Sequence, residues 1–313
     1  MVDGGIVVLG GTGFVGRHVV NRLAAEGGRV VVPTRRRGNA QRLNVLPTVN
    51  VVEVDVNRAD ELLRLIHGAS AIVNLVGILH ETKHASFRKV HVELTAKVIA
   101  ACGASGVRRL IHMSALHANP DGSSRYLSSK GEAAATVATS GLDWTIIEPS
   151  VIFGGEDRFL NLFAKFLRVL PFLALPRADA RFQPVFVGDV AECIVRALSL
   201  PATIGQRFPL CGPKTYTLRE LVRVVGETVG MQRPIIPLGR TLGTLQAMIL
   251  ERLPGTLLSR DNLASMATDS ICDCPFPAIF GVRAQALETI IPTYLAPEAA
   301  QSRYDVYRAS GRR

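Results

Sequence analysis

One glycine-rich segment near the start of the chain constrains the fold more than any other feature. The apolar run Ile6–Leu9 is followed by Gly10, Gly13 and Gly16, and a helical pattern of apolar residues continues over 14–26. This spacing lets the chain turn tightly, lets backbone amides approach a pyrophosphate, and lets a helix pack closely on a strand. Because strand, glycines and helix occur in the required order, the segment predicts the phosphate-binding turn of a dinucleotide fold.

The first half of the chain alternates short apolar runs with helical patterns. Helices are expected over 14–26 and 87–101. Strands are expected at Ile6–Leu9, Val30–Pro33, Val51–Val54, Ala71–Val76, Leu110–Met113 and Trp144–Ile147. These runs are almost continuously apolar, as strands buried on both faces of a parallel sheet are. The alternation therefore predicts an α/β fold, a Rossmann-type doubly wound parallel sheet.

After Pro149 the pattern becomes more mixed. We expect residues 1–150 to form the nucleotide-binding domain. Residues 151–300 would form a smaller mixed region, packed over the cofactor cleft, for a substrate or partner, and 301–313 a polar tail. Thr217 and Glu220 have the spacing of a capping box, and Asp189 is an expected N-cap. The other elements expected here are helices over 157–170, 190–199, 241–253, 259–267 and 284–295, and strands near 185–187 and 208–211.

The end of the second expected strand bears on the choice of nucleotide. A fold that binds NAD usually has an acid there for the ribose 2′-hydroxyl, but this chain has Thr34 followed by Arg35, Arg36 and Arg37. Arginine pairs well with a 2′-phosphate, so NADP(H) is favoured over NAD(H). The alternative is a solvated basic loop. Asp55, after the third strand, is placed either to accept a hydrogen bond from the adenine amine or to cap the next helix.

A second group of residues has the spacing of a catalytic site. Tyr126 and Lys130 are four residues apart, which places both on one face of a helix, and Ser114 follows the fifth expected strand. Such a set can reduce a carbonyl group. The tyrosine would donate a proton, the lysine would lower the tyrosine pKa and hold the nicotinamide ribose, and the serine would steady the substrate oxygen. Ser114, Tyr126 and Lys130 are therefore the candidate catalytic residues.

Taken together, these motifs resemble the extended and atypical short-chain dehydrogenase/reductase superfamily over nearly the whole chain. The resemblance implies the roles just given for Tyr126 and Lys130. It also implies that Asn74–Gly77 lines the cofactor and that Pro149 and Ser150 contact the nicotinamide. The cofactor contacts expected from the motifs and the resemblance together are Gly10, Thr12, Gly13, Phe14, Val15, Gly16, Arg35, Arg36, Asp55, Val56, Leu75, Val76, Gly77, Lys130, Pro149, Ser150 and Ile152.

One branch of this superfamily, epimerase/dehydratase-like in kind, is more similar still. The segments 124–130, 148–154, 156–161 and 183–190 resemble the thirty-nine-kilodalton accessory subunit of respiratory complex I and its bacterial relatives. That resemblance implies tight NADPH binding with a structural role, and a link to ubiquinone biosynthesis. Many superfamily enzymes use an Asn in the helix after strand four to support a proton relay. Here His91 lies in that helix, so either the histidine replaces the Asn or the relay is missing.

Charge and cysteine content narrow the partners and the compartment. The net charge of +10 is spread evenly over the chain, unlike the clustered basic stripe of a nucleic-acid binder. No metal site is expected, because Cys272-x-Cys274 lacks a second pair and no HExxH pattern occurs. An odd cysteine count with no disulfide pattern favours a reducing compartment. With no secretory signal or spanning segment apparent, we expect a cytoplasmic protein, and a peripheral location at the inner face of the cytoplasmic membrane is left open.

Two apolar stripes in the second half leave alternatives open. Phe159, Phe163, Phe166, Leu167 and Leu170 have basic neighbours, so their helix could lie on an anionic membrane or dock on a respiratory complex. Ordinary core packing is the favoured interpretation. The second stripe could line a pocket for an apolar substrate or belong to the core. It consists of Leu242, Leu245, Met248, Ile249 and Leu253.

Three functions remain open on the sequence alone. The first is an NADP-dependent oxidoreductase that acts on a carbonyl or hydroxyl of a small, quinone- or isoprenoid-related substrate. The second is a cofactor-holding accessory or assembly protein of complex I or of quinone biosynthesis, with little turnover. A nucleotide-sugar epimerase or dehydratase shares the fold, but no sequence feature selects a sugar nucleotide. The chemistry of the Ser-Tyr-Lys set places the oxidoreductase slightly ahead, and the chain is expected to be an enzyme.

Overall fold

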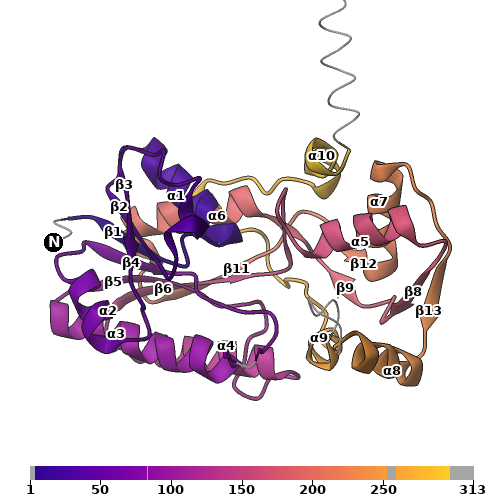
Figure 1. The fold of residues 1–313 in the computed structure, drawn as a ribbon, viewed down its shortest axis with the longest axis horizontal. Helices are drawn as coiled ribbons and strands as arrows, with labels where there is room; N and C mark the ends of the chain where they lie inside the picture. Colours follow the sequence, from indigo (N-terminus) through magenta and orange to yellow (C-terminus); the bar gives the residue numbers. More distant parts are fainter. Residues whose placement is uncertain (1–3, 83, 252–258, 297–313) are drawn as a thin grey trace, which may run out of the picture. The chain divides into compact units, whose positions relative to one another are not determined.

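A seven-stranded parallel sheet is the centre of the N-terminal half (Figure 1). The computed structural model describes residues 4–82, 84–251 and 259–296. The strand order is β11-β6-β5-β4-β1-β2-β3, and every pairing is parallel. The expected doubly wound α/β fold is confirmed. Its strands are β1 (Ile6–Leu9), β2 (Val30–Thr34), β3 (Val49–Glu53), β4 (Ala71–Asn74), β5 (Arg109–Met113), β6 (Asp143–Pro149) and β11 (Gln206–Leu210).

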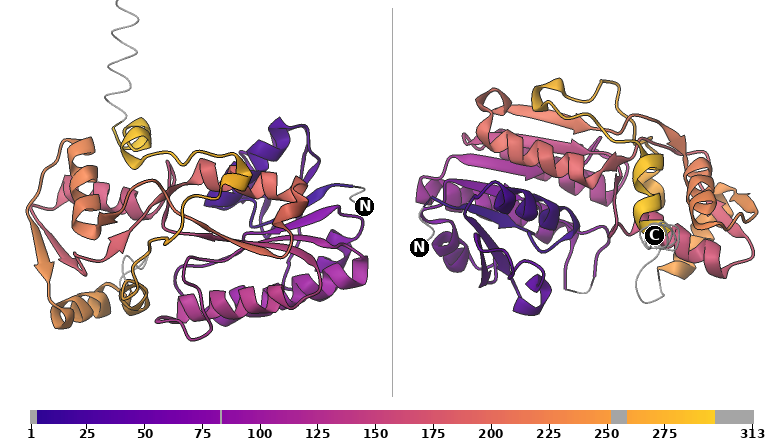
Figure 2. Two further views of the ribbon diagram at one scale, coloured as in Figure 1. Left: turned by 180° about the vertical axis from the view of Figure 1, so that it is seen from behind. Right: turned by 90° about the horizontal axis from the view of Figure 1, so that it is seen from above.

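Helices cover both faces of this sheet (Figure 1; Figure 2). One layer contains α1 (Phe14–Ala25) and α6 (Val187–Ser199), which pack on each other. The other contains α2 (Ala59–Ile66), α3 (Leu94–Ser105) and α4 (Arg125–Ala138). The strand order reverses between β1 and β4, and ligands of such sheets bind beyond the carboxyl ends of the strands at that point.

Three elements differ from the sequence expectation. The helix expected over 87–101 begins as a π-helix over Arg88–Glu93, and only then continues as α3. Asp189 lies inside the first turn of α6 rather than at its N-cap, because the helix already begins at Val187. The helix expected over 284–295 consists of α10 (Leu287–Ile290) and α11 (Pro292–Leu295), because a proline opens the second one. The expected tail over 301–313 lies outside the described residues.

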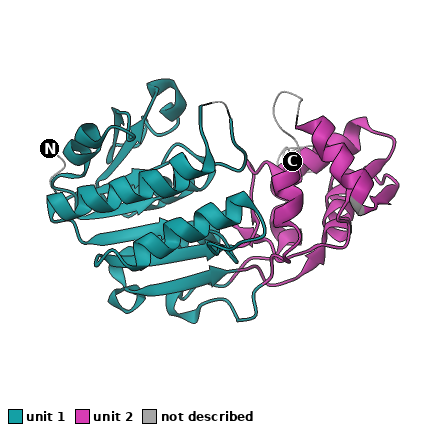
Figure 3. Ribbon diagram, turned by 90° about the horizontal axis from the view of Figure 1, so that it is seen from below, with its two compact units in different colours: residues 1–149, 187–210, 272–283 teal, residues 150–186, 211–271, 284–313 magenta. Residues whose placement is uncertain are grey.

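The chain divides into two compact units (Figure 3). The first contains residues 1–149, 187–210 and 272–283, and the second contains residues 150–186, 211–271 and 284–313. The strand expected near 208–211 is β11, which pairs with β6 along its whole length. Its segment therefore returns to the first unit and completes the central sheet.

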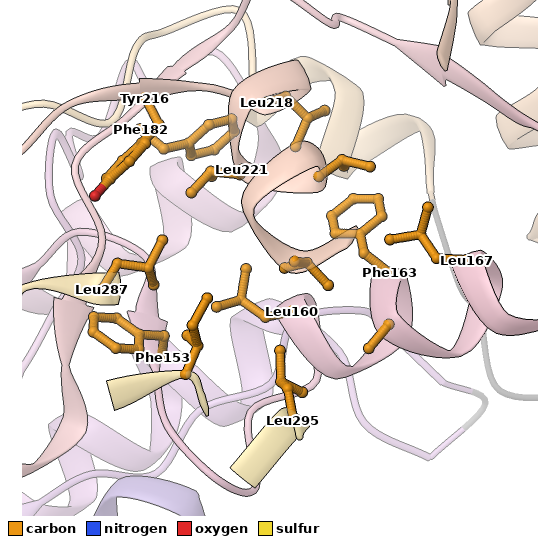
Figure 4. Packing of buried hydrophobic residues seen from close by; sticks show 14 of the residues in the cluster. Phe153, Leu160, Phe163, Leu167, Phe182, Tyr216, Leu218, Leu221, Leu287 and Leu295 are labelled. Atoms are coloured by element: carbon orange, nitrogen blue, oxygen red, sulfur yellow. The ribbon is translucent and has the colours of Figure 1, made fainter. Parts of the chain in front are cut away.

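The second unit has its own apolar core, between α5 and α7 (Figure 4). Phe163 and Leu167 of α5 are buried there, and Phe159 and Phe166 pack against it, so core packing is confirmed for these four residues of the stripe. The fifth, Leu170, is exposed. The capping box of Thr217 and Glu220 is also confirmed, at the start of α7. The elements are β7 (Ile152–Phe153), α5 (Phe159–Val169), β8 (Leu173–Pro176), β9 (Arg181–Phe182), β10 (Val185–Phe186), β12 (Tyr216–Thr217), α7 (Leu218–Val229), β13 (Ile235–Leu238), α8 (Arg240–Leu250), α9 (Arg260–Ser265), α10 and α11.

The cysteines correct one expectation. Cys102, Cys193 and Cys274 are free, whereas Cys211 and Cys272 are disulfide-bonded. The expectation that the cysteines form no disulfide is therefore wrong, and the argument for a reducing compartment loses one of its supports. Within the described residues, no group of metal-ligating side chains gathers. No helix in that part of the chain is long and apolar enough to cross a bilayer.

Candidate functional site

The glycines of the first turn allow close backbone contacts that a side chain would prevent. Gly10 has a φ of +79°, and a Cβ there would lie 3.1 Å from the carbonyl carbon of Leu75. A Cβ on Gly16 would lie 2.1 Å from the carbonyl oxygen of Gly10. Gly13 is the N-cap of α1 and provides no side-chain cap, so the backbone alone forms this end of the helix. The turn therefore has the close backbone packing between strand, loop and helix that the glycines of a pyrophosphate-binding turn allow.

The other residues expected around this turn lie where the motif places them. Thr12 is half-buried in the turn itself. Phe14 and Val15 open α1, and Val15 is buried against the sheet while Phe14 is half-buried. Both stand in the first helical turn, whose backbone amides face an incoming anion.

The basic cluster lies at the carboxyl end of β2. Arg35, Arg36 and Arg37 are all exposed, so their guanidinium groups are accessible to a ligand. The hydroxyl of Thr34 donates to the carbonyl of Arg36 at 3.0 Å and fixes the direction of the chain there. An exposed arginine cluster at this position fits the expected contact with a 2′-phosphate.

Asp55 lies at the end of the neighbouring strand, β3, and holds the turn that follows. Its Oδ1 atom accepts hydrogen bonds from the backbone and side-chain nitrogens of Asn57, at 3.1 and 2.7 Å. These hydrogen bonds, with the positive charge of nearby Arg35, hold the pKa of Asp55 below its usual value. Asp55 therefore closes the turn before α2 and does not cap that helix, whose N-cap is Arg58. Its other carboxylate oxygen keeps acceptor capacity, and the contact with the adenine amine stays a prediction. Val56 packs partly against the core of the sheet.

The loop after β4 connects the phosphate turn to the candidate catalytic residues. The backbone N–H of Leu75 donates to the carbonyl of Leu9 at 2.9 Å. The N–H of Val76 donates to the side-chain oxygen of Asn74 at 3.3 Å. The buried Asn74 amide also contacts Nδ1 of His112, at 3.3 Å. These bonds hold the backbone of residues 75–77 beside the glycine turn.

Gly77 is the point where this loop meets α4. A Cβ on this exposed glycine would lie 3.2 Å from Nζ of Lys130 and 3.5 Å from Nε2 of His91. Lys130 itself is buried, and its Nζ donates to the carbonyl of Met113 at 2.9 Å. Burial lowers the pKa of Lys130 to about 8, so the ammonium form still prevails at neutral pH.

Tyr126 stands one turn before Lys130 on α4. The helix is capped by Ser124, whose hydroxyl oxygen accepts from the N–H of Leu127 at 3.1 Å. The Tyr126 ring lies edge-on to His91, with 5.7 Å between ring centroids. Burial raises the pKa of Tyr126 to about 12, so the phenol is protonated at neutral pH. The lowering of this pKa that the sequence analysis expected from Lys130 is not seen.

Ser114 follows β5 directly and is buried against α4. Its hydroxyl donates to the backbone carbonyl of Lys130 at 3.4 Å, and its backbone N–H donates to the carbonyl of Ile147 at 2.8 Å. The structure thus brings Ser114 and Lys130 together at the carboxyl end of β5. The hydroxyl would have to leave the Lys130 carbonyl before it could donate to a substrate oxygen.

Comparison with known proteins identifies the family. Residues 10–162 match the model of a family described as NAD(P)H-binding. The chain is 30% identical to NADH dehydrogenase [ubiquinone] 1 alpha subcomplex subunit 9 of Arabidopsis thaliana, over 84% of this chain and 70% of that protein. The chain belongs to the NAD(P)-binding short-chain dehydrogenase/reductase superfamily. The superfamily resemblance expected from the motifs is therefore confirmed.

Further relatives include the same subunit of another organism and proteins with other names. The same subunit of Mus musculus is 35% identical over 70% of this chain, and the chain spans only 59% of the length of that relative. A ceramide reductase of Caulobacter vibrioides is 28% identical over 75% of this chain and 74% of that protein. In fold, the chain is similar to an NADPH-dependent quinone oxidoreductase of Escherichia coli. That similarity has a TM-score of 0.75 at 19% identity and covers 91% of this chain and 97% of that one.

Three predicted cofactor contacts lie at or beyond the end of β6. The carbonyl of Pro149, the last residue of the strand, accepts from the N–H of Leu116 at 3.0 Å. Ser150 and Ile152 belong to the second unit. The Ser150 hydroxyl lies 2.8 Å from the carbonyl oxygen of Ser270, and Ile152 pairs with Val185 in β7 and β10.

Sequence reasoning singled out His91 but missed its partners. The Nε2 atom of His91 accepts from the backbone N–H of Ile78 at 3.1 Å, so the ring proton resides on Nδ1. That Nδ1 lies 2.8 Å from the hydroxyl of Ser129, which donates to the carbonyl of Tyr126 at 2.9 Å. The π-helix carries His91, and π-helical turns are frequent at functional sites. No pattern in the sequence predicts a π-helical turn at this position.

Proposed function

We propose that this short-chain dehydrogenase/reductase is an NADP(H)-dependent oxidoreductase that reduces a carbonyl group, or oxidises the corresponding alcohol, of a small apolar substrate. The observation that carries the proposal is a continuous path of close contacts. Gly10 lies against the backbone of Leu75, and Gly77, two residues on, lies against Lys130. Lys130 and Tyr126 share α4, so a dinucleotide laid along this path would reach the Ser-Tyr-Lys set.

Two features of the chain support NADP(H) as the cofactor. The glycine turn packs backbone against backbone at Gly10 and Gly16, where Cβ atoms would collide, as the turn that holds a pyrophosphate does. The exposed Arg35 and Arg36 at the end of β2 supply donors for a 2′-phosphate. No acid stands at the end of β2, which a ribose 2′-hydroxyl would prefer.

When bound, NADPH supplies the hydride that reduces the carbonyl carbon. The protonated phenol of Tyr126 donates its proton to the carbonyl oxygen, which gives the alcohol and leaves a tyrosinate. The ammonium of Lys130, on the same helix one turn away, stabilises that negative charge. Ser114 positions the substrate oxygen once its hydroxyl leaves the Lys130 carbonyl. A proton from water then restores Tyr126.

A quinone- or isoprenoid-related carbonyl is the proposed substrate class. The relatives include a protein named ceramide reductase, whose substrate is a lipid by name, and a subunit of an enzyme named for ubiquinone. Both names point to apolar molecules with a long hydrocarbon portion. We place the protein in the cytoplasm, peripheral to the inner face of the membrane where such molecules reside.

A second candidate function is a cofactor-holding subunit of a respiratory or quinone-synthesis complex. The identity of 35% to subunit 9 of mouse complex I favours it, as does the state of the site. The Ser114 hydroxyl is engaged, both His91 nitrogens have partners, and the Tyr126 pKa is raised. In that role NADP(H) would stabilise the fold and the partner would be another subunit.

Oxidation of NADPH with short-chain quinones and apolar ketones separates the two candidates. As an oxidoreductase, the wild type turns over, and Tyr126→Phe lowers kcat by about 100-fold or more, while the NADPH dissociation constant stays within about twofold. Ser128→Ala, on the same helix, is the matched control and keeps full activity. The cofactor-holding role is supported if wild type and Tyr126→Phe bind NADPH equally well and neither oxidises it in the presence of any of these quinones or ketones.

A further inference from the structure

Helix α8 of the second unit is turned with its small residues inward. Gly243 and Ala247 are buried, whereas the large apolar side chains of the same helix are between 40% and 59% exposed. The exposed set, here called the α8 stripe, consists of Leu242, Leu245, Met248 and Ile249. Leu253, the fifth residue of the stripe expected from the sequence, lies outside the described residues. Ordinary surface helices show the opposite pattern, with large apolar residues facing the core.

Contacts with β8 fix this orientation. A Cβ on Gly243 would lie 2.7 Å from Cβ of Pro176, and Nε2 of Gln246 donates to the carbonyl of Ala174 at 3.1 Å. From Gly243 to Gln246 the helix advances by three residues, while its contact on the strand moves back from Pro176 to Ala174, so α8 runs back along β8. The end of α8 therefore points toward Phe172, which precedes β8 and is itself exposed beside Val169 and Leu170.

The α8 stripe has no partner in the core of the second unit. Within the described residues, that core includes side chains of α5, α7, α10 and α11 but none of α8 (Figure 4). Residues 241–250 also contain no charged side chain. Single exposed apolar residues are normal, but a contiguous set of this size marks an interaction surface.

The charges around the stripe select the kind of partner. Among the described residues, the segments 159–181, 231–251 and 259–260 together contain seven basic residues and two acidic ones, by sequence. Glu251, one of the two acids, is already paired with Arg260 at 3.0 Å. Exposed Arg177 follows Pro176, at the start of α8. Exposed Arg233 donates to the carbonyl of Leu167, toward the end where Phe172 lies.

We propose that the α8 stripe is a docking surface for an anionic phospholipid membrane. The large side chains of α8 would enter the boundary between headgroups and acyl chains, with the helix lying in the membrane plane. Arg177 and Arg233 would contact lipid phosphates at its two ends. This docking is independent of the proposed reaction, because no residue of the Ser-Tyr-Lys set takes part.

Vesicle flotation of the full chain tests the proposal. The vesicles contain phosphatidylcholine alone or with about one third phosphatidylglycerol, at low and at physiological salt. We expect the wild type to float with the anionic vesicles, and Leu245→Ser/Ile249→Ser to bind at least tenfold more weakly. Val45→Ser/Ile204→Ser is the matched control, because both residues are exposed and lie in the other unit. Circular dichroism and NADPH binding confirm that each variant is folded.

A charge variant separates headgroup contact from apolar contact. Arg177→Gln should weaken binding to anionic vesicles severalfold and reduce its dependence on salt, whereas Arg29→Gln should change neither. Equal flotation of the wild type and the α8 variant would overturn the proposal. Flotation that is equal with and without phosphatidylglycerol would overturn it as well. So would a wild-type dimer in solution that Leu245→Ser/Ile249→Ser converts to a monomer, because the stripe would then bind a second copy of the chain.

Discussion

The Nδ1 atom of His91 lies 2.8 Å from the hydroxyl oxygen of Ser129, and that hydroxyl donates to the carbonyl of Tyr126. On the other side of the ring, Nε2 accepts from the N–H of Ile78. The histidine therefore joins the loop after β4 to the first turns of α4. Through Ser129, the ring is linked to the backbone carbonyl of Tyr126, so we expect His91 to position Tyr126.

This arrangement predicts how stability depends on acid. Burial lowers the pKa of His91 to about 2 and that of His112 to about 3, from an ordinary value of 6.5, so both are neutral when folded. Below pH 6.5 the unfolded chain takes up protons that the folded chain does not. Stability is therefore full above pH 6.5 and falls toward pH 3, by about 1.4 kcal/mol per pH unit for each histidine.

Denaturant unfolding at several pH values between 7 and 4 measures this slope. His91→Gln should remove about half of it, because one of the two histidines no longer titrates. Exposed His84→Gln is the control and should leave the slope unchanged. An unchanged slope in His91→Gln would mean that this ring is already charged or solvated in the folded protein.

Gly77→Ala should weaken NADPH binding with little effect on the fold. The new Cβ would lie 3.2 Å from Nζ of Lys130, the far end of a flexible side chain, so the ammonium is displaced at low cost to stability. We expect about a 10- to 100-fold loss of affinity, as for the loss of a charge-assisted hydrogen bond. Gly103→Ala meets no atom within 4 Å and should keep the affinity. Fluorescence titration with NADPH measures these affinities. Equal affinities of the wild type and Gly77→Ala would mean that Gly77 does not lie beside the bound cofactor.

Gly16→Ala should instead damage the fold itself. Its Cβ would lie 2.1 Å from the Gly10 carbonyl oxygen and 2.6 Å from Cα of Gly11, and both are backbone atoms. We expect a loss of about 3 kcal/mol or more in the free energy of unfolding, measured by denaturant titration. Stability near that of the wild type would show that the turn can open without α1 leaving the sheet.

The local features of the fold could be predicted from the sequence. The six early strands are nearly continuous apolar runs, and the glycine spacing identifies the first turn, so β1 to β6 and the α/β fold could be located. Capping chemistry also identified the start of α7 at Thr217. These features are local, because each depends on residues that are only a few positions apart in the sequence.

What the sequence could not predict depends on contacts between distant segments. β11 was expected in the mixed C-terminal region, but it pairs with β6, about sixty residues earlier. The π-helix that turns His91 toward Ser129 has no signal in the residues around it. The apolar residues of α8 have helical spacing, which indicates a stripe but not whether the stripe faces the core or the solvent.

The arginine cluster predicts the preference between nucleotides. Replacing Arg35 and Arg36 together by Gln removes two charged donors, each worth about 1.5–3 kcal/mol if it contacts the 2′-phosphate. NADPH affinity should fall by at least about tenfold, while NADH affinity, which needs neither residue, should stay nearly constant. Arg29 is exposed elsewhere in the same unit, so Arg29→Gln is the control and should change neither affinity. A parallel loss for both nucleotides would make the cluster a general electrostatic attractor.

The most direct test of the central claim is a paired titration of the purified wild-type chain with NADPH and with NADH, at one salt concentration. The account predicts that NADPH binds at least about tenfold more tightly, because the 2′-phosphate has arginine partners at the end of β2. Equal affinities, or tighter binding of NADH, would contradict it.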